Sequence, residues 1–408
     1  MKTSLPRRIA PFTAATLALP LVAAAATSAA PAAFAAVAGT QTCAKTPRLL
    51  STKPVSQLAL PGGATARVWD TGHRAYDMSE SRLAAVVIPR GKLTPKVVSA
   101  PTLTSGSTTA AMAAGNSRAV VALNGAVFDE YDLVPSDSQV LNGLFRKGTT
   151  AATRALAVYG TTKSAAIAKV AMTGTVKSVR GTIRVGAVNW QELSTAGVTV
   201  YTSAWGNWDH PTGRSTVVVQ GGKVTGFLSG WDGEGRPGSG QTYLTARRGS
   251  TYAAGLAKLR VGDKVTVATA PAGRVVYGAK AGPLGAPTGV LGISSMLLAG
   301  GVNQALCSDR NETLRPRTAI GWKKNGDMVV AAVSGRAMRS GILYGGATVH
   351  QWADYMHQLG AVDAAIFDGG NSTTFLVRTK VGGPLMRLDR PGRAPQRSIA
   401  DALIFQAG

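Results

Sequence analysis

The sequence of 408 residues is short of the side chains on which many enzymes depend. It has four histidines and two cysteines, and no Cys and His spacing typical of a zinc site. The G-x-S-x-G nucleophile turn, the P-loop and the Rossmann dinucleotide fingerprint are also absent. These absences argue against zinc sites, α/β-hydrolases, P-loop NTPases and dehydrogenases.

Acidic residues are scarce as well, since 20 Asp and Glu face 44 Lys and Arg and the formal net charge is +24. This excess predicts affinity for polyanions, and anionic cell-envelope polymers are the partners that we expect. A basic protein that only coexists with an anionic envelope would show the same balance, so charge alone does not name the partner. No arginine-rich block with interleaved aromatic residues is present, and no nucleic acid is expected.

Long apolar runs are confined to the N-terminus. Three basic residues precede the alanine-rich stretch Ile9–Ala26, and residues 33–35 offer a cleavage site of the A-x-A type. Pro20 and the alanine content make this stretch a poor membrane span, which argues against an uncleaved anchor. We therefore predict a signal peptide over residues 1–35, a secreted mature protein and no membrane span.

The two cysteines, Cys43 and Cys307, lie far apart in the sequence. In an exported protein, such a pair is best explained by one disulfide, which would join the N-terminal arm to the segment before Arg315. Two buried thiols that never meet are the alternative. We predict the disulfide.

Short apolar, β-branched runs separated by Gly, Pro, Asn and Asp make up most of the mature chain. Gly221-Gly222 and Asn325-Gly326 lie between such runs and predict hairpin turns. The runs predict strands at Leu83–Ile88, Ala119–Leu123, Thr216–Val219, Lys264–Ala268, Met328–Val333 and Ala364–Phe367.

Helical patterns are few. The best covers Val349–Leu359, with Thr348 and Gln351 as a capping box and Gly360 as the stop. A shorter helix is expected around Thr108–Ala114. The predicted fold class is therefore α+β, with mixed, largely antiparallel β-sheets and a few helices.

Residues 205–243 are rich in glycine and tryptophan and predict a long loop or an insertion hairpin. Trp208 and Trp231 are candidates for stacking on sugar rings, although core packing explains a tryptophan equally well. Asp232-Gly233-Glu234 offers too few spaced ligands to establish a calcium site. No cofactor is established, and a divalent cation (Ca²⁺ or Mg²⁺) stays open.

The segment Ala364–Phe375 concentrates polar groups at the end of an apolar strand, where Asp368 enters a glycine turn. Two glycines let the backbone approach a ligand closely and turn N–H groups toward it. An ordinary Asp-Gly hairpin turn is the alternative. The polar or flexible residues after the aspartate are Gly369, Gly370, Asn371, Ser372 and Thr373.

Arginines mark two other strand ends. Arg315 and Arg317 flank a stiff proline where a strand begins, and Arg336 follows another strand. A guanidinium group in such a place is suited to a bidentate grip on phosphate, although surface charge is the alternative in so basic a chain. Asn124 and Asp129 belong to a further polar turn after a strand.

These four segments, in this order, resemble the N-G-G-x-F, R-P-R-T-A-I-G, D-G-R and D-G-G-G-S segments of the phosphodiester glycosidase family, which includes the uncovering enzymes. The likeness extends from Arg67 to Phe405 and includes Gln396–Leu403. In this chain the four segments are Asn124–Phe128, Arg315–Gly321, Ser334–Arg336 and Asp368–Ser372.

The resemblance implies a phosphodiester glycosidase-like domain over residues 67–408, after an N-terminal arm over residues 36–66. It also implies hydrolysis of the glycosidic bond of a sugar 1-phosphodiester, of the N-acetylglucosamine 1-phosphate type, to free sugar and a phosphomonoester. Carried over by position, the candidate catalytic residues are Asp368, Arg317, Arg336 and Asn124. The substrate-binding candidates are Gly369, Gly370, Asn371, Ser372, Thr373, Arg315, Asp129 and Arg397.

Three positions depart from the family pattern. Asn371 stands where the family usually has a third glycine, Ser334 where it usually has Asp, and Ala126 where a glycine is common. A catalytically degenerate, basic binding protein for phosphate-containing cell-envelope glycopolymers is therefore the alternative function. A structural protein that adheres to the envelope is a third reading and predicts scattered charge without a cleft.

A site with one obvious carboxylate suits this reaction. Ordinary glycosidases need a second carboxyl group because an alkoxide leaving group must be protonated. A phosphate monoester leaves more easily, and arginines can neutralise it. We expect Asp368 to activate water or attack the anomeric carbon while Arg317 and Arg336 hold the phosphate.

Overall fold

The computed structural model describes Cys43 and residues 45–46, 53–70, 81–207, 211–229, 236–307, 313–335, 337–339, 342–389 and 396–408. The predicted signal peptide and the candidates Trp208, Trp231 and Arg336 lie outside the described residues. Residues Thr42–Gly408 form one unit.

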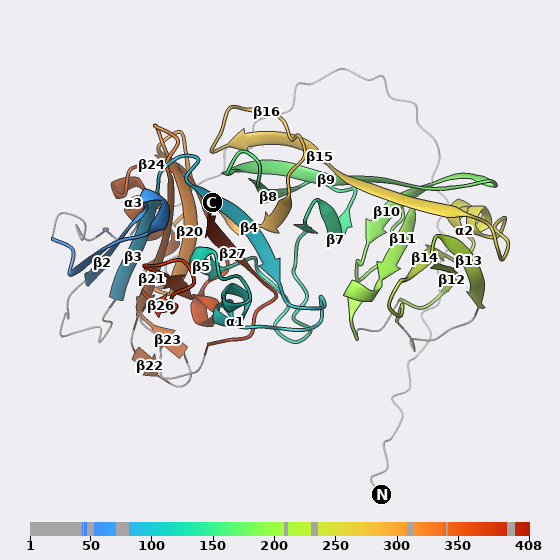
Figure 1. Cartoon of the computed structure of the whole chain (residues 1–408), viewed down its shortest axis with the longest axis horizontal. Coiled ribbons are helices and arrows are strands. Elements are labelled where there is room, and N and C mark those ends of the chain that lie inside the picture. The colour runs from blue at the N-terminus through green and yellow to red at the C-terminus, as the bar shows by residue number, and fades with distance from the viewer. Residues whose placement is uncertain are drawn as a thin grey trace, which may run out of the picture. The chain divides into compact units, whose positions relative to one another are not determined.

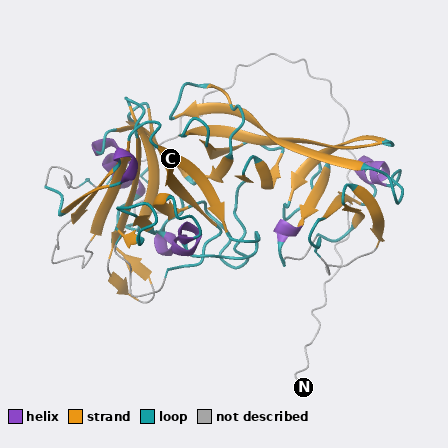
Figure 2. Cartoon of the chain, viewed as in Figure 1, coloured by secondary structure: helices purple, strands orange, loops and turns teal. Residues whose placement is uncertain are grey.

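Two sheets pack face to face and enclose the main core (Figures 1 and 2). Side chains of Val86 and Ile320 from one sheet and of Leu123 and Phe405 from the other are all fully buried in this core. The eight-stranded sheet has the order β1 (Ser56–Ala59), β2 (Thr65–Asp70), β3 (Ser81–Ile88), β21 (Met328–Gly335), β20 (Arg317–Lys323), β24 (Ala361–Ile366), β18 (Ser295–Ala299) and β19 (Val302–Asn303). The five-stranded sheet has the order β26 (Met386–Arg387), β25 (Phe375–Val377), β5 (Ala119–Asn124), β27 (Asp401–Ala407) and β4 (Leu93–Ser99).

A third, twelve-stranded sheet has a core of its own. Its long strands β9 and β15 pair over most of their length (Figure 1). The pairing of β10 with β11 is the one parallel pairing among the described strands. The order is β13 (Lys223–Ser229), β12 (Arg214–Gln220), β14 (Gln241–Arg247), β11 (Val198–Thr202), β10 (Gly181–Val188), β7 (Leu144–Thr149), β6 (Gln139–Leu141), β17 (Gly289–Gly292), β8 (Thr153–Tyr159), β9 (Ser164–Ser178), β15 (Val265–Tyr277) and β16 (Gly282–Pro283). Strands β22 (Ala337–Arg339) and β23 (Ile342–Tyr344) form a separate pair.

The described part of the chain contains three α-helices, so the fold is largely β rather than the predicted α+β. Helix α3 (Val349–Gln358) begins as predicted, with the Thr348–Gln351 capping box formed at its start, and ends one residue before the predicted Leu359, which is its C-cap. Helix α1 (Thr109–Ala114) is also confirmed, with the Thr108 hydroxyl as its cap. Helix α2 (Thr251–Leu256) was not predicted, although the Ser250 hydroxyl caps it as Thr108 caps α1.

The predicted hairpin turns at Gly221-Gly222 and Asn325-Gly326 connect β12 to β13 and β20 to β21. Both glycines of the first turn have positive φ, of 56° and 73°, a backbone conformation that residues with a side chain rarely adopt. The stretch 205–243 therefore contains a hairpin instead of one continuous loop. Its residues 208–210 and 230–235 lie outside the described part.

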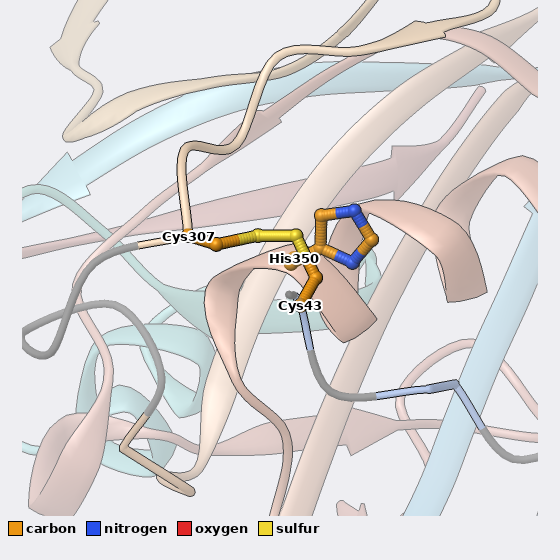
Figure 3. A group of neighbouring side chains, drawn as sticks. All are labelled: Cys43, Cys307 and His350. Carbon is orange, nitrogen blue, oxygen red and sulfur yellow. A yellow bond between two sulfur atoms is a disulfide. The ribbon is translucent and has the colours of Figure 1, made fainter. Parts of the chain in front are cut away.

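The predicted disulfide is present between Cys43 and Cys307, whose Cα atoms lie 5.4 Å apart (Figure 3). The arm next to it is also bound to helix α3. The hydroxyl of Thr46 donates to Asp354 at 2.6 Å, and the Gln351 amide donates to the Lys45 carbonyl at 3.1 Å. The disulfide therefore reinforces a contact that has hydrogen bonds of its own.

Replacing both cysteines (Cys43→Ser with Cys307→Ser) should lower the free energy of unfolding by about 2–4 kcal/mol, because the cross-link closes a loop of 264 residues. Urea unfolding under oxidising and reducing conditions measures this loss. Reduced wild type should match the double variant, and Thr46→Val should cost only about 1 kcal/mol. Equal stability of the oxidised wild type and the double variant would contradict the prediction.

Candidate active site

Asp368 lies in a cavity of about 840 Å³ that collects several of the predicted residues. Arg315 and Arg317 line it from the start of β20, and Arg397 lines it from the segment before β27. The remaining lining residues are Val127, Glu130, Ser294, Ser295, Met296, Gln304, Ala305, Leu306, Pro316, Val349, Ile366, Phe367, Gly369, Gly370 and Asn371.

Strand pairing explains why the aspartate and the arginines meet. Strands β20 and β24 are antiparallel neighbours, with Ala319 opposite Ile366. The beginning of β20 therefore lies beside the end of β24, and Arg317 comes to the same edge as Asp368. Two residues that lie 51 positions apart in the sequence become neighbours through this register alone.

The glycine turn after Asp368 packs against the Arg315–Arg317 segment. The Gly370 N–H donates to the Pro316 carbonyl at 2.9 Å, and a Cβ atom on Gly369 would lie 2.7 Å from the same oxygen. Gly370 has a φ of +60°, which favours glycine. Asn371 is exposed and is not among the residues with positive φ, so the backbone accepts a side chain at this third position.

Asn124 holds Asp368 in place from behind. Its side-chain amide donates to the Asp368 carbonyl at 2.8 Å, and its oxygen accepts from the Thr318 hydroxyl at 2.7 Å and the Thr374 N–H at 3.2 Å. The Asn124 side chain is fully buried. The structure therefore places Asn124 behind the Asp368 turn and outside the cavity lining, where it can position Asp368, and its catalytic role stays a prediction.

Asp401, at the start of β27, supports the same turn. Its carboxylate accepts from the Ala126 N–H at 2.9 Å and from the Gln139 side chain at 2.7 Å. Burial, opposed by these hydrogen bonds, raises the pKa of Asp401 to about 6, and the charge of Asp368 adds to the rise. Asp401 belongs to the segment Gln396–Leu403, and the sequence alone indicates no role for it because its burial depends on distant residues.

Burial raises the pKa of Asp368 above its ordinary value, and the charge of Glu130 acts in the same direction. The Ser372 hydroxyl, the Gly369 N–H and Arg397 lower this pKa. Ser372 is buried, and its hydroxyl reaches no partner with full hydrogen-bonding geometry among the described residues. It affects Asp368 as a nearby dipole. Asp368 is thus a carboxylate with an increased affinity for a proton.

Two backbone carbonyls hold the guanidinium of Arg317. Its Nε donates to the Ala347 carbonyl at 3.2 Å and its Nη2 to the Thr313 carbonyl at 3.1 Å. Burial and the neighbouring Arg315 lower its pKa to about 10, so it stays charged at neutral pH. Its backbone contacts fix the guanidinium direction before any ligand binds.

Arg397 is paired with Glu130 at 2.9 Å and lies over the Phe128 ring, 5.2 Å from its centroid. The pairing lowers the pKa of Glu130. The second carboxylate of the cavity is therefore engaged by an arginine, whereas Asp368 has no ion pair among the described residues.

Some predicted residues lie away from the cavity. The Asp129 carboxylate accepts from the backbone N–H groups of Tyr131 and Asp132, and it lines a neighbouring cavity of about 620 Å³. Thr373 is buried and is not among the lining residues. Ser334 is 2 % exposed within β21 and does not line the cavity either. The Asp-to-Ser departure therefore removes no carboxylate from this cavity.

Potential metal ligands are sparse in the described part of the chain. One group of three His, Cys, Asp or Glu side chains lies within ligand distance there, namely Cys43, Cys307 and His350 (Figure 3). Its two sulfur atoms are bonded to each other, so the group lacks the thiolates that a metal requires. In the same described residues, no helix has the length and apolarity needed to cross a bilayer.

Residues 213–406 match the family model described as phosphodiester glycosidase. The match includes Arg317, Asp368 and Arg397, whereas Asn124 lies before it. No curated protein matches the sequence.

Two solved structures share the fold. A hypothetical protein from Synechocystis is 20% identical with a TM-score of 0.65, over 88% of this chain and 64% of that one. A Burkholderia pseudomallei protein described as exported is 18% identical with a TM-score of 0.56, over 80% of this chain and 74% of that one. This chain thus spans 64% of the length of the Synechocystis protein.

A third structure is the catalytic domain of zebrafish N-acetylglucosamine-1-phosphodiester α-N-acetylglucosaminidase, auto-inhibited by its pro-peptide. It is 12% identical with a TM-score of 0.40, over 89% of this chain and 91% of that one. So weak a likeness carries no argument about this chain.

Asn124→Ala should lower the free energy of unfolding by about 2–4 kcal/mol, because it leaves a buried hydroxyl and buried backbone groups without their partner. Chemical denaturation of the purified variant measures the loss. Asn371→Gly, at an exposed position, should change stability by less than about 1 kcal/mol. A loss at Asn124 no larger than that at Asn371 would show that the amide does not hold the turn.

Proposed function

We propose that this chain, whose residues 213–406 match the phosphodiester glycosidases, is a hydrolase that cleaves the glycosidic bond of a sugar 1-phosphodiester. The products are the free sugar and a phosphomonoester. The observation that carries the proposal is the convergence of Asp368 with Arg315, Arg317 and Arg397 on one cavity.

The chemistry of the leaving group explains how so few carboxylates suffice. When the anomeric C–O bond breaks, the bonding electrons stay on the phosphate oxygen, and positive side chains can stabilise this charge without a general acid. Arg317 is suited to this role because its Nε and Nη2 are anchored to backbone carbonyls. Its Nη1 has no hydrogen-bond partner among the described residues and can donate to a phosphate oxygen.

Asp368 supplies the negative group that the reaction needs. Its carboxylate either removes a proton from the attacking water or bonds to the anomeric carbon and is later released by water. Glu130 is held by Arg397 and is the weaker candidate. Asp368 acts in its ionised form, so its raised pKa predicts that activity falls as the pH is lowered through that pKa.

The setting that we propose is outside the cell, on anionic envelope polymers that contain phosphodiester-linked sugars. The disulfide supports an oxidising compartment, and the excess of basic residues supports attraction to a polyanion. The predicted signal peptide is consistent with export. The departures from the family pattern at Ser334 and Asn371 give little support to the binding-only alternative. Ser334 does not line the cavity, and the backbone at Asn371 accepts a side chain.

Asp368→Asn should reduce hydrolysis of UDP-GlcNAc and of an alkyl diester of GlcNAc 1-phosphate by about 10³-fold or more, with the fold retained. Free GlcNAc is measured with and without EDTA, which also tests whether Ca²⁺ or Mg²⁺ is required. Glu130→Gln is the matched carboxamide change and should cost about 10-fold or less. Undiminished turnover by Asp368→Asn would contradict its role. Tight binding of teichoic-type polymers without turnover of any diester would favour the binding-only alternative.

Arg317→Gln should lower kcat by about 10²–10³-fold, because a preorganised donor to the leaving phosphate is lost. Arg317→Lys keeps the charge without the planar fork and should recover only part of this loss. Steady-state kinetics separate the effects on kcat and KM. Arg154→Gln changes the net charge equally at an exposed position outside the cavity lining and is the control. An equal loss in this control would mean that only overall charge matters.

A further inference from the structure

Asp401 carries a buried carboxylate that the proposed reaction does not use. It is the first residue of β27, its side chain is 1 % exposed, and it is not among the residues that line the 840 Å³ cavity. A buried carboxylate is costly to ionise unless its surroundings compensate it. Its hydrogen bonds show where that compensation comes from.

The compensating groups belong mainly to the turn that follows β5. The Asp401 carboxylate accepts from the Ala126 N–H, and the Asp401 carbonyl accepts from the Gly125 N–H at 3.0 Å. A Cβ atom on Gly125 would overlap the Asp401 carboxylate, so the turn and the carboxylate fit each other only with glycine at this position. Asp401 therefore fixes the backbone of residues 124–126.

The same turn binds Asp368 through both its backbone N–H and its backbone carbonyl. The Asp368 N–H donates to the Gly125 carbonyl at 3.1 Å, and the Asn124 amide donates to the Asp368 carbonyl. The path from Asp401 to Asp368 thus consists of hydrogen bonds through one short piece of backbone. Its members are buried or partly buried, so water competes little for these bonds.

Charged and polar groups from several elements surround Asp401 and Asp368. Asp401 interacts with Arg146 on β7 and with the Gln139 side chain on β6. Asp368 interacts with Arg397 and Glu130. The charge of Asp368 raises the pKa of Asp401, and burial keeps this repulsion strong, whereas Asp401 is not among the groups that shift the pKa of Asp368.

We propose that Asp401 is a positioning residue for Asp368. Asp401 holds the turn of residues 124–126, which is hydrogen-bonded to Asp368, and it places a second negative charge behind Asp368. The catalytic consequence rests on the proposed function, while the coupling between the two carboxylates does not. The two groups should titrate as a coupled pair. Removing the charge of Asp368 should make Asp401 easier to ionise.

Asp401→Asn removes the negative charge of Asp401 but can keep the hydrogen bonds that hold the turn. The new oxygen can accept from the Ala126 N–H, and the new amide can donate to Gln139 Oε1, which is buried without a partner. We expect the acid limb of the kcat/KM profile, which follows the ionisation of Asp368, to stay in place, because Asp401 is not among the groups that shift the pKa of Asp368. Because the turn keeps its support, kcat/KM on the high-pH side should fall by less than about 10-fold.

Two further variants distinguish positioning from general stability. Asp401→Ala removes the support as well and should lower kcat by about 10²-fold, provided that the variant folds. Asp389→Asn changes another buried carboxylate, whose partners are Arg387 and the Phe375 N–H. It should lower stability and leave kcat within about 10-fold of the wild-type value.

A second measurement needs no turnover. The ordinary pKa of an aspartate is 3.8 and that of Asp401 is about 6, so folding raises it. The protonated form is therefore favoured in the folded state, and stability due to this group is lost as the pH rises from about 4 to about 6. Denaturation across this range is compared for wild type, Asp401→Asn, Asp368→Asn and the double variant. In the Asp368→Asn background, the loss attributed to Asp401 should move to lower pH.

The outcomes separate the two proposals. A folded Asp401→Ala variant that keeps the kcat of an active wild type, or a double variant whose pH-dependent stability is the sum of the single variants, overturns the positioning role. Absence of turnover from wild type overturns the proposed function instead. In that case, non-additive stability would still support the coupling of the two carboxylates.

Discussion

The buried amide of Asn124 joins the two sheets of the main core, and the candidate site depends on this junction. Asn124 ends β5 in the five-stranded sheet, and its oxygen accepts from Thr318 on β20 in the eight-stranded sheet. Its nitrogen donates to the carbonyl of Asp368 just after β24. Such a side chain saturates backbone and side-chain groups that water cannot reach, so the sheets and the Asp368 loop are stabilised together.

The electrostatics of the cavity depend on this arrangement. The net charge of +24 is spread over the chain, but burial concentrates the effect of a few groups. Arg317 loses water and gains two carbonyl contacts, while Asp368 loses water without an ion pair among the described residues. A fixed cation and a proton-seeking carboxylate in one cavity suit a reaction in which negative charge develops on a phosphate.

The N-terminal arm and the cavity wall are connected through helix α3. Cys307 follows the lining residues Gln304, Ala305 and Leu306, and its disulfide joins this segment to Cys43. Asp354 of α3 binds both Thr46 of the arm and Asn303 beside the wall. One wall of the cavity is therefore held by a covalent bond and by a shared carboxylate.

Local interactions made much of the structure predictable from the sequence alone. The capping box at Thr348 and the turn at Asn325-Gly326 depend on residues a few positions apart, and the single cysteine pair left one disulfide to form. The Asp368 turn and the basic segment were recognisable as motifs, but their meeting depends on the register of β20 and β24. The tertiary structure alone decided that Asn124 is a support, that Asp129 faces a different cavity and that Asp401 lies behind the site. The physical reason is that burial and hydrogen-bond partners are set by strands far apart in the sequence, whereas caps and turns are set by neighbours.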